Sequence, residues 1–196
     1  MVLGLRTSDD VFVVDKPEFP DSMTAKWDSS AISSLLCSAF APDLARARTI
    51  DTAPKAAIDV LITFDGGGVS GHPNHVSLYH GAKTFIAALV AGKPGWEQPV
   101  DLYTLTTIPF ARKYTGFLDV LATLASWAVG ADKKDKAHPG GLVFLSGLVG
   151  EGSVMTAWKA MVSAHKSQMV WFRYGWITLS RYMYINDLRL EKVKRR

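Results

Sequence analysis

Apolar and polar residues alternate along the chain in blocks that predict strands and helices in turn. The continuous apolar run AIDVLITF (57–64) is typical of a strand that is covered on both sides in a parallel sheet. Three other apolar runs predict strands: VFVV (11–14), VDLYTLTTI (100–108) and GLVFLSG (141–147), the last of which we expect to be the final strand.

Between these runs, apolar residues recur at the three- and four-residue spacing of amphipathic helices. One such helix is expected after Asp28, whose side chain can cap it, and a second begins near Pro73. Two more are expected over 112–127 and from Ser153 onward. Strands that alternate with helices predict one α/β domain over residues 1–196, with a mainly parallel sheet and helices on both faces.

Composition narrows the class of protein. The 196 residues carry a net charge of +4, part of which lies in the final EKVKRR, and this favours an anionic surface as partner. No nucleic-acid-binding motif is present, so we expect no nucleic-acid partner. The single cysteine, Cys37, falls in a helical pattern and is expected to be a buried structural residue. No apolar stretch is long enough to span a membrane.

The turn after the central apolar run carries the candidate chemistry, because ligands bind beyond the carboxyl ends of strands in such sheets. Asp65 and Gly66–Gly68 are followed by Gly-His-Pro-Asn-His, in which His72 is the expected helix cap and His75 lies in the first turn. The positive helix end disfavours a protonated His75, which leaves it able to ligate a metal. His80 lies about 140° further around the helix and should not reach the same point. The glycines offer a second interpretation, a phosphate cradle, and a plain strand-to-helix connection is the third.

Four motifs together resemble a known family. They are TFDGGGVSGHPNH (63–75), FPDSMTAKWD (19–28), ARKY (111–114) and AHKSQMVWFRYGWITLSRYMYIN (164–186). They are similar to the motifs of the N-acetylglucosaminyl-phosphatidylinositol de-N-acetylases of GPI-anchor biosynthesis, members of the LmbE-like zinc deacetylases with a Rossmann-like fold. The resemblance covers essentially the whole chain.

The resemblance implies a zinc-dependent hydrolase that removes the N-acetyl group of GlcNAc-phosphatidylinositol at the cytoplasmic face of the endoplasmic reticulum membrane. It makes His75 a zinc ligand and His72 an acid or electrostatic stabiliser. Asp65 is the nearest carboxylate that can orient them. A deacetylase of the same superfamily with a soluble substrate is disfavoured by the aromatic and basic segment near the C-terminus.

The chain also departs from the family pattern. The family's A-H-P-D-D motif, which supplies its other ligands and its base, is absent. Ala137-His138-Pro139 lies in the wrong place, and Asp9-Asp10 lacks a preceding His-Pro. We therefore expect a chain that is incomplete at its N-terminus, lacks the first strand and helix, and by itself binds zinc poorly and does not turn over. The alternative is a non-catalytic lipid- or partner-binding homologue that has lost the metal site.

Residues near the C-terminus suggest contact with a lipid. The segment 169–186 combines aromatic residues with Arg173 and Arg181, which is typical either of a helix at the core edge or of a membrane-interface face. Arg112 and Lys113 are candidates for the inositol phosphate. His165 lies on the apolar stripe of its helix, where we expect it to support the site structurally.

Overall fold

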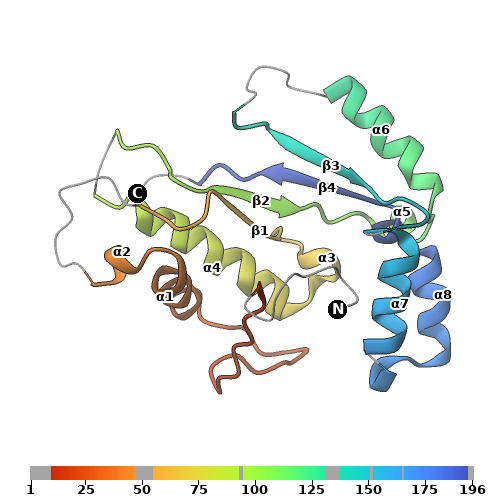
Figure 1. Cartoon of the computed structure of the whole chain (residues 1–196), viewed down its shortest axis with the longest axis horizontal. Coiled ribbons are helices and arrows are strands. Elements are labelled where there is room, and N and C mark those ends of the chain that lie inside the picture. The colour runs from red at the N-terminus through yellow and green to blue at the C-terminus, as the bar shows by residue number, and fades with distance from the viewer. Residues whose placement is uncertain are drawn as a thin grey trace. The chain divides into compact units, whose positions relative to one another are not determined.

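The computed structural model describes residues 10–46, 55–92, 95–130, 137–150, 152–164 and 166–193. Its strands are β1 (Val60–Phe64), β2 (Asp101–Leu105), β3 (Gly141–Leu145) and β4 (Ile185–Leu190). Its α-helices are α1 (Ser29–Phe40), α2 (Pro42–Arg46), α3 (Gly68–Gly71), α4 (Pro73–Leu89), α5 (Phe110–Lys113), α6 (Leu118–Gly130), α7 (Val154–Ala164) and α8 (Trp171–Leu179) (Figure 1). Two short 3₁₀ turns, η2 (Lys166–Gln168) and η3 (Arg181–Met183), flank α8.

The described strands form one sheet in the order β1-β2-β4-β3. β1 and β2 are parallel, with Val60 opposite Asp101, whereas β2 and β4 are antiparallel, with Tyr103 opposite Leu190. The fold is therefore α/β with a mixed sheet, which is compatible with a Rossmann-like LmbE fold and corrects the expectation of a mainly parallel one. β4 was missed because polar and charged residues interrupt its apolar pattern.

The chain divides into two compact units. Unit 2 comprises Lys16–Thr107, Lys134–Gly141 and Leu188–Arg196. Unit 1 comprises Met1–Asp15, Ile108–Lys133 and Leu142–Asp187. The expectation of a single domain stays a prediction.

Unit 2 is built on the packing of α1 and α4 beneath β1 and β2 (Figure 1). Asp28 caps α1 as expected, because its carboxylate accepts the N–H of Ala31. The core of this unit is apolar and consists of Cys37, Ala41, Ala82, Phe85, Ile86, Leu89, Val100 and Leu102. Burial raises the pKa of the Cys37 thiol, which a hydrogen bond with Ser33 only partly offsets, so this residue is structural.

β1 differs from its expected environment. It lies at one end of the described strand order, and Val60 and Ile62 are 45% and 57% exposed. The apolar run therefore does not form a strand covered on both faces in the described part of the chain. VFVV (11–14) is not a strand either; its side chains are exposed and its backbone is irregular.

Unit 1 contains α5 to α8, and a buried ion-pair network lies within it. Arg181 is fully buried, with Nε 2.5 Å from Oδ2 of Asp119 and Nη1 3.0 Å from Oδ1 of Asp187. Arg112 completes the network through Nε, 2.7 Å from Oδ1 of Asp119, and the Thr123 hydroxyl donates to the same aspartate. Two arginines and two aspartates thus fix α5, α6, η3 and the start of β4 together.

Candidate active site

The candidate site lies in unit 2, where β1 ends and α4 begins. Its backbone is set by Asp65, whose carboxylate accepts the N–H of Gly67 at 3.0 Å and the N–H of Thr107 at 2.6 Å. The Thr107 hydroxyl donates to the same carboxylate and accepts the N–H of Val69 at 2.9 Å. Asp65 and Thr107 therefore join the ends of the two parallel strands and shape the glycine-rich turn between β1 and α4.

This turn is tightly built. A Cβ on Gly67 would lie 2.7 Å from Oγ1 of Thr107, and Gly68 and Gly71 have positive φ angles of 56° and 72°. Val69 also has a positive φ of 65°, which is a strained conformation for a β-branched residue. Backbone strain of this kind persists only where the surrounding contacts hold the residue in place, and it is found most often at functional sites.

His72 is the N-cap of α4, as expected from the proline that follows it. Its Nδ1 accepts the N–H of Asn74 at 3.3 Å. Since a backbone N–H can only donate, Nδ1 must be unprotonated, and the neutral ring then carries its proton on Nε2. His72 can therefore offer an N–H to a ligand.

Nδ1 of His75 faces a hydrogen-bond acceptor, whereas Nδ1 of His72 faces a donor. Nδ1 of His75 lies 3.1 Å from the carbonyl oxygen of Gly68, and the His75 ring stacks on Phe64 with centroids 3.9 Å apart. A carbonyl oxygen can only accept, so Nδ1 must carry a proton, and in the neutral ring Nε2 then keeps its lone pair. This arrangement, in which a backbone carbonyl fixes the second nitrogen, is the one that metal-ligating histidines use.

The two imidazoles form a pair. Their ring centroids are 4.8 Å apart, and both side chains are half-buried. One ring offers an N–H and the other a lone pair, so the pair suits a site that binds a metal ion beside a group accepting a hydrogen bond. His80 is exposed and contacts Tyr79, which agrees with its expected exclusion from the pair.

A complete metal site is not formed by the described residues. Within the ranges that the structure covers, no three His, Cys, Asp or Glu side chains lie close enough to hold a metal ion. His138 is exposed, and its Nδ1 lies 2.8 Å from Oδ2 of Asp101 at the start of β2, whereas the histidine pair follows the end of β1. The described donor set, His75 with one free nitrogen, therefore does not fit a catalytic zinc, which normally takes three protein ligands.

The other predicted site residues fall in unit 1. Arg112 is partly exposed but pairs with Asp119, and Lys113 contacts the ring of Tyr114. Burial lowers the pKa of Lys113. Arg173 is exposed, whereas Arg181 is fully buried. His165 lies outside the described residues.

The position of Arg181 corrects the expectation that it meets lipid at the surface. Its guanidinium faces Asp119, Asp187 and Thr123 in the interior, where no headgroup can reach it. The sequence did not reveal this because both aspartates lie on other elements. The carboxylate of Asp65 is bonded to Gly67 and Thr107, and its predicted role in orienting the histidines stays a prediction.

Sequence reasoning missed three residues of the site. Phe64 stacks on His75, and Thr107 holds the turn. Asn74 is buried, with Nδ2 donating to the carbonyl of Pro20 at 2.9 Å and no hydrogen-bond partner for Oδ1 in the described chain. Thr107 follows the strand next to β1, so the rule that sites form at the carboxyl ends of neighbouring strands would have found it.

The chain was compared with known proteins. It is 48% identical, over 97% of its length, to a protein of Arthroderma benhamiae named N-acetylglucosaminyl-phosphatidylinositol de-N-acetylase. A Schizosaccharomyces pombe protein named as a probable enzyme of this kind is 34% identical over 91% of the chain. A Bos taurus protein with the same name as the first is 32% identical over 95% of the chain. No family model and no solved structure matches.

The chain is therefore similar, over nearly its whole length, to proteins named as established or probable N-acetylglucosaminyl-phosphatidylinositol de-N-acetylases. The chain spans 63% of the length of the Arthroderma benhamiae relative and 60% of each of the other two.

Proposed function

We propose that the protein acts as a zinc-dependent hydrolase in GPI-anchor biosynthesis. It removes the acetyl group from GlcNAc-phosphatidylinositol, giving GlcN-phosphatidylinositol and acetate, at the cytoplasmic face of the endoplasmic reticulum membrane. The observation that carries the proposal is the pair His72 and His75, held by backbone partners in complementary protonation states within a homologue of named de-N-acetylases.

His75 is the residue that we assign to the metal. Its protonated Nδ1 is bonded to Gly68, and the stacked Phe64 ring fixes the direction in which Nε2 points. The chemistry that zinc supplies when bound is a water acidic enough to ionise near pH 7 and a polarised amide carbonyl. Because the described residues give one suitable ligand, the proposal requires further ligands from outside them, and the 196-residue chain alone should bind zinc weakly.

His72 is the residue that we assign to the developing charge. In amide hydrolysis, water adds to the carbonyl carbon, negative charge grows on the oxygen, the C–N bond breaks and the amine takes up a proton. A neutral imidazole with its proton on Nε2 can donate a hydrogen bond to that oxygen. The cap bond to Asn74 favours this stabilising role over that of a proton-donating acid, because a protonated Nδ1 would lose the cap.

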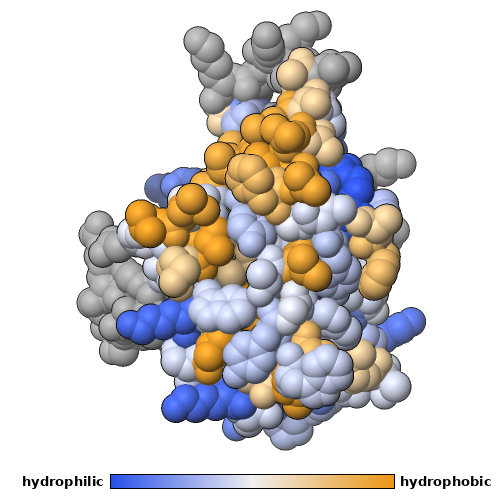
Figure 2. All heavy atoms as spheres, turned by 90° about the vertical axis from the view of Figure 1, so that its right-hand side faces the viewer, coloured by the Kyte–Doolittle hydropathy of each residue, from blue (hydrophilic) through white to orange (hydrophobic). Residues whose placement is uncertain are grey.

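The lipid part of the substrate implies a membrane surface as partner. Within the described ranges, no helix is both long and apolar enough to span a bilayer. Unit 1 nevertheless exposes large apolar and aromatic side chains on α6, α7 and α8 (Figure 2). Arg173 and the partly exposed Arg112 and Lys113 are the cations that we propose for lipid or inositol phosphate.

The second candidate function is a non-catalytic lipid- or partner-binding homologue. It is favoured by one observation, the lack of a complete metal-binding group among the described residues. The two functions differ in what His75 does, since only the enzyme needs its Nε2.

A hybrid protein distinguishes the enzyme from the non-catalytic homologue. In the Arthroderma benhamiae relative, the matched segment is replaced by this chain, and acetate release from GlcNAc-phosphatidylinositol is measured. We expect an active hybrid, in which His75→Asn keeps an N–H for Gly68 but abolishes activity, and His72→Asn keeps a cap but lowers kcat by about 100-fold. The matched control His80→Asn changes an exposed histidine of the same helix and should leave the rate unchanged. A folded but inactive hybrid supports the non-catalytic homologue instead, whereas full activity in His75→Asn would refute the assignment of His75 to the metal.

A further inference from the structure

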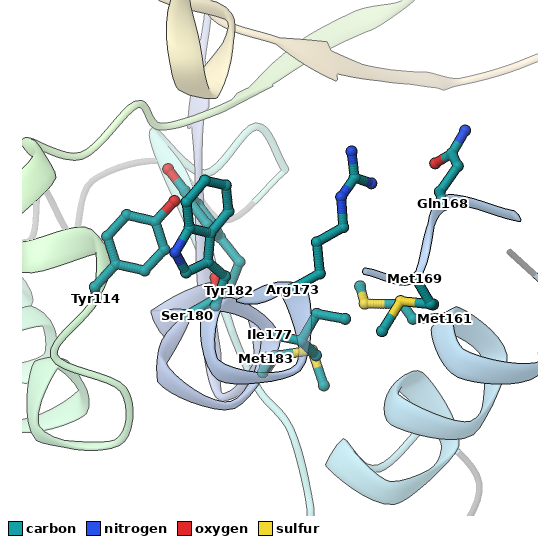
Figure 3. Close-up of a pocket in the computed structure, with 10 residues that line it drawn as sticks. Tyr114, Met161, Gln168, Met169, Arg173, Ile177, Ser180, Tyr182 and Met183 are labelled. Carbon is teal, nitrogen blue, oxygen red and sulfur yellow. The ribbon is translucent and has the colours of Figure 1, made fainter. Parts of the chain in front are cut away.

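Unit 1 contains a pocket of about 440 Å³ beside α7 and α8. Figure 3 shows Met161 and Met169 on one side of it, Tyr114 on the other, and Ile177 and Met183 between them. Its volume lies within the range of ordinary ligand sites, roughly 300–1,000 Å³. Methionine side chains are flexible and adapt their shape, so these walls suit an apolar ligand without a rigid outline.

The pocket is also lined by polar side chains. Arg173 and Gln168 line it, and in Figure 3 their guanidinium and amide groups extend away from the methionines, toward the same side. The Arg173 side chain has no hydrogen bond or ion pair with any described residue, and it is exposed. An unpaired guanidinium at the edge of an apolar pocket matches a ligand with a phosphate group and an apolar tail.

The surface around the pocket has the composition of a membrane-interface face. Trp171 is 85% exposed and Trp176 is 55% exposed, and Phe172 and Tyr174 are also exposed on α8. Tryptophan and tyrosine combine an apolar ring with a polar group, and they favour the headgroup region of a bilayer.

The positive charge of this region favours an anionic partner. From Gly152 to Asn186 the sequence contains no Asp or Glu, while Lys159, Lys166 and Arg173 are exposed cations. A second copy of the chain would place like charges against each other, which disfavours a dimer through this face. A small soluble phosphate would leave the apolar walls uncovered. An anionic bilayer satisfies both the charge and the apolar walls.

We infer that this pocket holds one acyl chain of an anionic bilayer phospholipid, whose phosphate pairs with Arg173. The inference rests on the membrane-surface part of the proposed function and adds a specific lipid subsite to it. Binding of this kind does not need the histidine pair, so His75→Asn in the full chain should leave lipid binding unchanged. Failure of deacetylation and failure of lipid binding are thereby distinguishable.

The test uses the full chain and vesicles of phosphatidylcholine with and without phosphatidylinositol that carries a photoactivatable acyl chain. We expect cross-links at Met161, Met169 and Ile177, seen by mass spectrometry, and stronger sedimentation with the anionic vesicles. Arg173→Gln should lower binding by about five-fold, the effect of one cation near an anionic surface. Lys26→Gln, which removes an exposed cation of unit 2, is the matched control and should change little.

Three results would overturn the inference. The first is cross-linking spread over exposed leucines of α6, such as Leu118 and Leu121, instead of the pocket. The second is equal binding of Arg173→Gln and Lys26→Gln. The third is full competition by soluble inositol phosphate, which would show a headgroup site with no acyl chain. Trp176→Ser, a substitution of a half-exposed lining residue, gives an independent check and should reduce the pocket cross-links.

Discussion

Two backbone groups, the carbonyl of Gly68 and the N–H of Asn74, decide which nitrogen of each histidine is free. The carbonyl requires a proton on Nδ1 of His75, and the N–H requires a lone pair on Nδ1 of His72. The sequence predicted the roles of these residues from the cap position and from the family motif. It could not predict the Gly68 contact, because that contact depends on the strained turn at Val69.

The cap predicts the effect of changing His72 on stability. His72→Asn retains an oxygen that can accept the N–H of Asn74, so its free energy of unfolding should equal or exceed that of the native chain. His72→Ala removes the cap and should cost about 1 kcal/mol. Urea unfolding of both variants checks this, and equal losses in both would contradict the assignment of His72 as a cap.

The tightness of the turn predicts the effect of a methyl group at Gly67. Its Cβ would lie 2.8 Å from Cβ of Thr107, whose hydroxyl and N–H are bonded to Asp65. Gly67→Ala should therefore cost about 1–3 kcal/mol of unfolding free energy, by overpacking. Gly140→Ala is the matched control, because a Cβ there meets nothing within 4 Å. Thermal denaturation compares the two, and an unchanged midpoint in Gly67→Ala would refute the close contact.

At the scale of elements, the contact of α1 with α4 depends on one glycine. A Cβ on Gly81 would lie 2.5 Å from Cβ of Ile32, which is buried on α1. Gly81→Ala should destabilise the protein by about 1–3 kcal/mol despite its better helix propensity. Gly175→Ala in α8 has open space and should stabilise by up to about 1 kcal/mol. Chemical denaturation measures the change in unfolding free energy of each variant. A change of the same sign in both variants would contradict this packing of α1 against α4.

The ion-pair network of unit 1 predicts a pH dependence. Burial alone would raise the pKa of Asp119, but hydrogen bonds from Arg112 and Thr123, together with the charges of Arg181 and Arg112, outweigh it and lower the pKa. A carboxylate with a lowered pKa in the folded state contributes stability above its unfolded pKa. That contribution is lost as the pH falls through the folded pKa.

Asp119→Asn should therefore cost about 3 kcal/mol near pH 7, where it leaves the buried Arg181 poorly compensated. The difference from the native chain should narrow below about pH 4, the ordinary range of an aspartate. Unfolding free energies measured from pH 7 downward check both points. A difference that stays constant with pH would mean that Asp119 does not titrate with folding.

The elements themselves were predictable where local chemistry decides them. The caps at Asp28 and His72 gave α1 and α4 correctly, and the start of α7 after Ser153 is also confirmed. β4 could not be predicted, since its pairing with β2 brings together residues far apart in sequence and its own pattern is polar. The exposure of β1 was missed because an apolar run does not reveal which strands neighbour it.

On the scale of the whole molecule, the chain contains two compact units, with the histidine pair in unit 2 and the aromatic, basic face in unit 1. The proposed enzyme uses both units, one for chemistry and one for the lipid. The sequence predicted these two functions through separate motifs. It assigned Arg181 to the lipid face, because only the folded chain shows that Asp119 and Asp187 enclose it.

The partial donor set predicts weak metal binding by the chain alone. Since the described residues supply one suitable ligand, zinc added to the purified 196-residue chain should be removed by dialysis. Atomic absorption would then find well below one equivalent. Stoichiometric zinc that survives dialysis would contradict this interpretation and would require ligands outside the described residues within this chain.

The central claim, that Nδ1 carries a proton in His75 but not in His72, is tested most directly by long-range ¹H–¹⁵N NMR of the chain near neutral pH. His72→Asn and His75→Asn assign the two rings. The account predicts that His75 carries its proton on Nδ1 and His72 on Nε2. If both rings carry the proton on the same nitrogen, or His75 is protonated on Nε2, the proposed ligand and donor roles are contradicted.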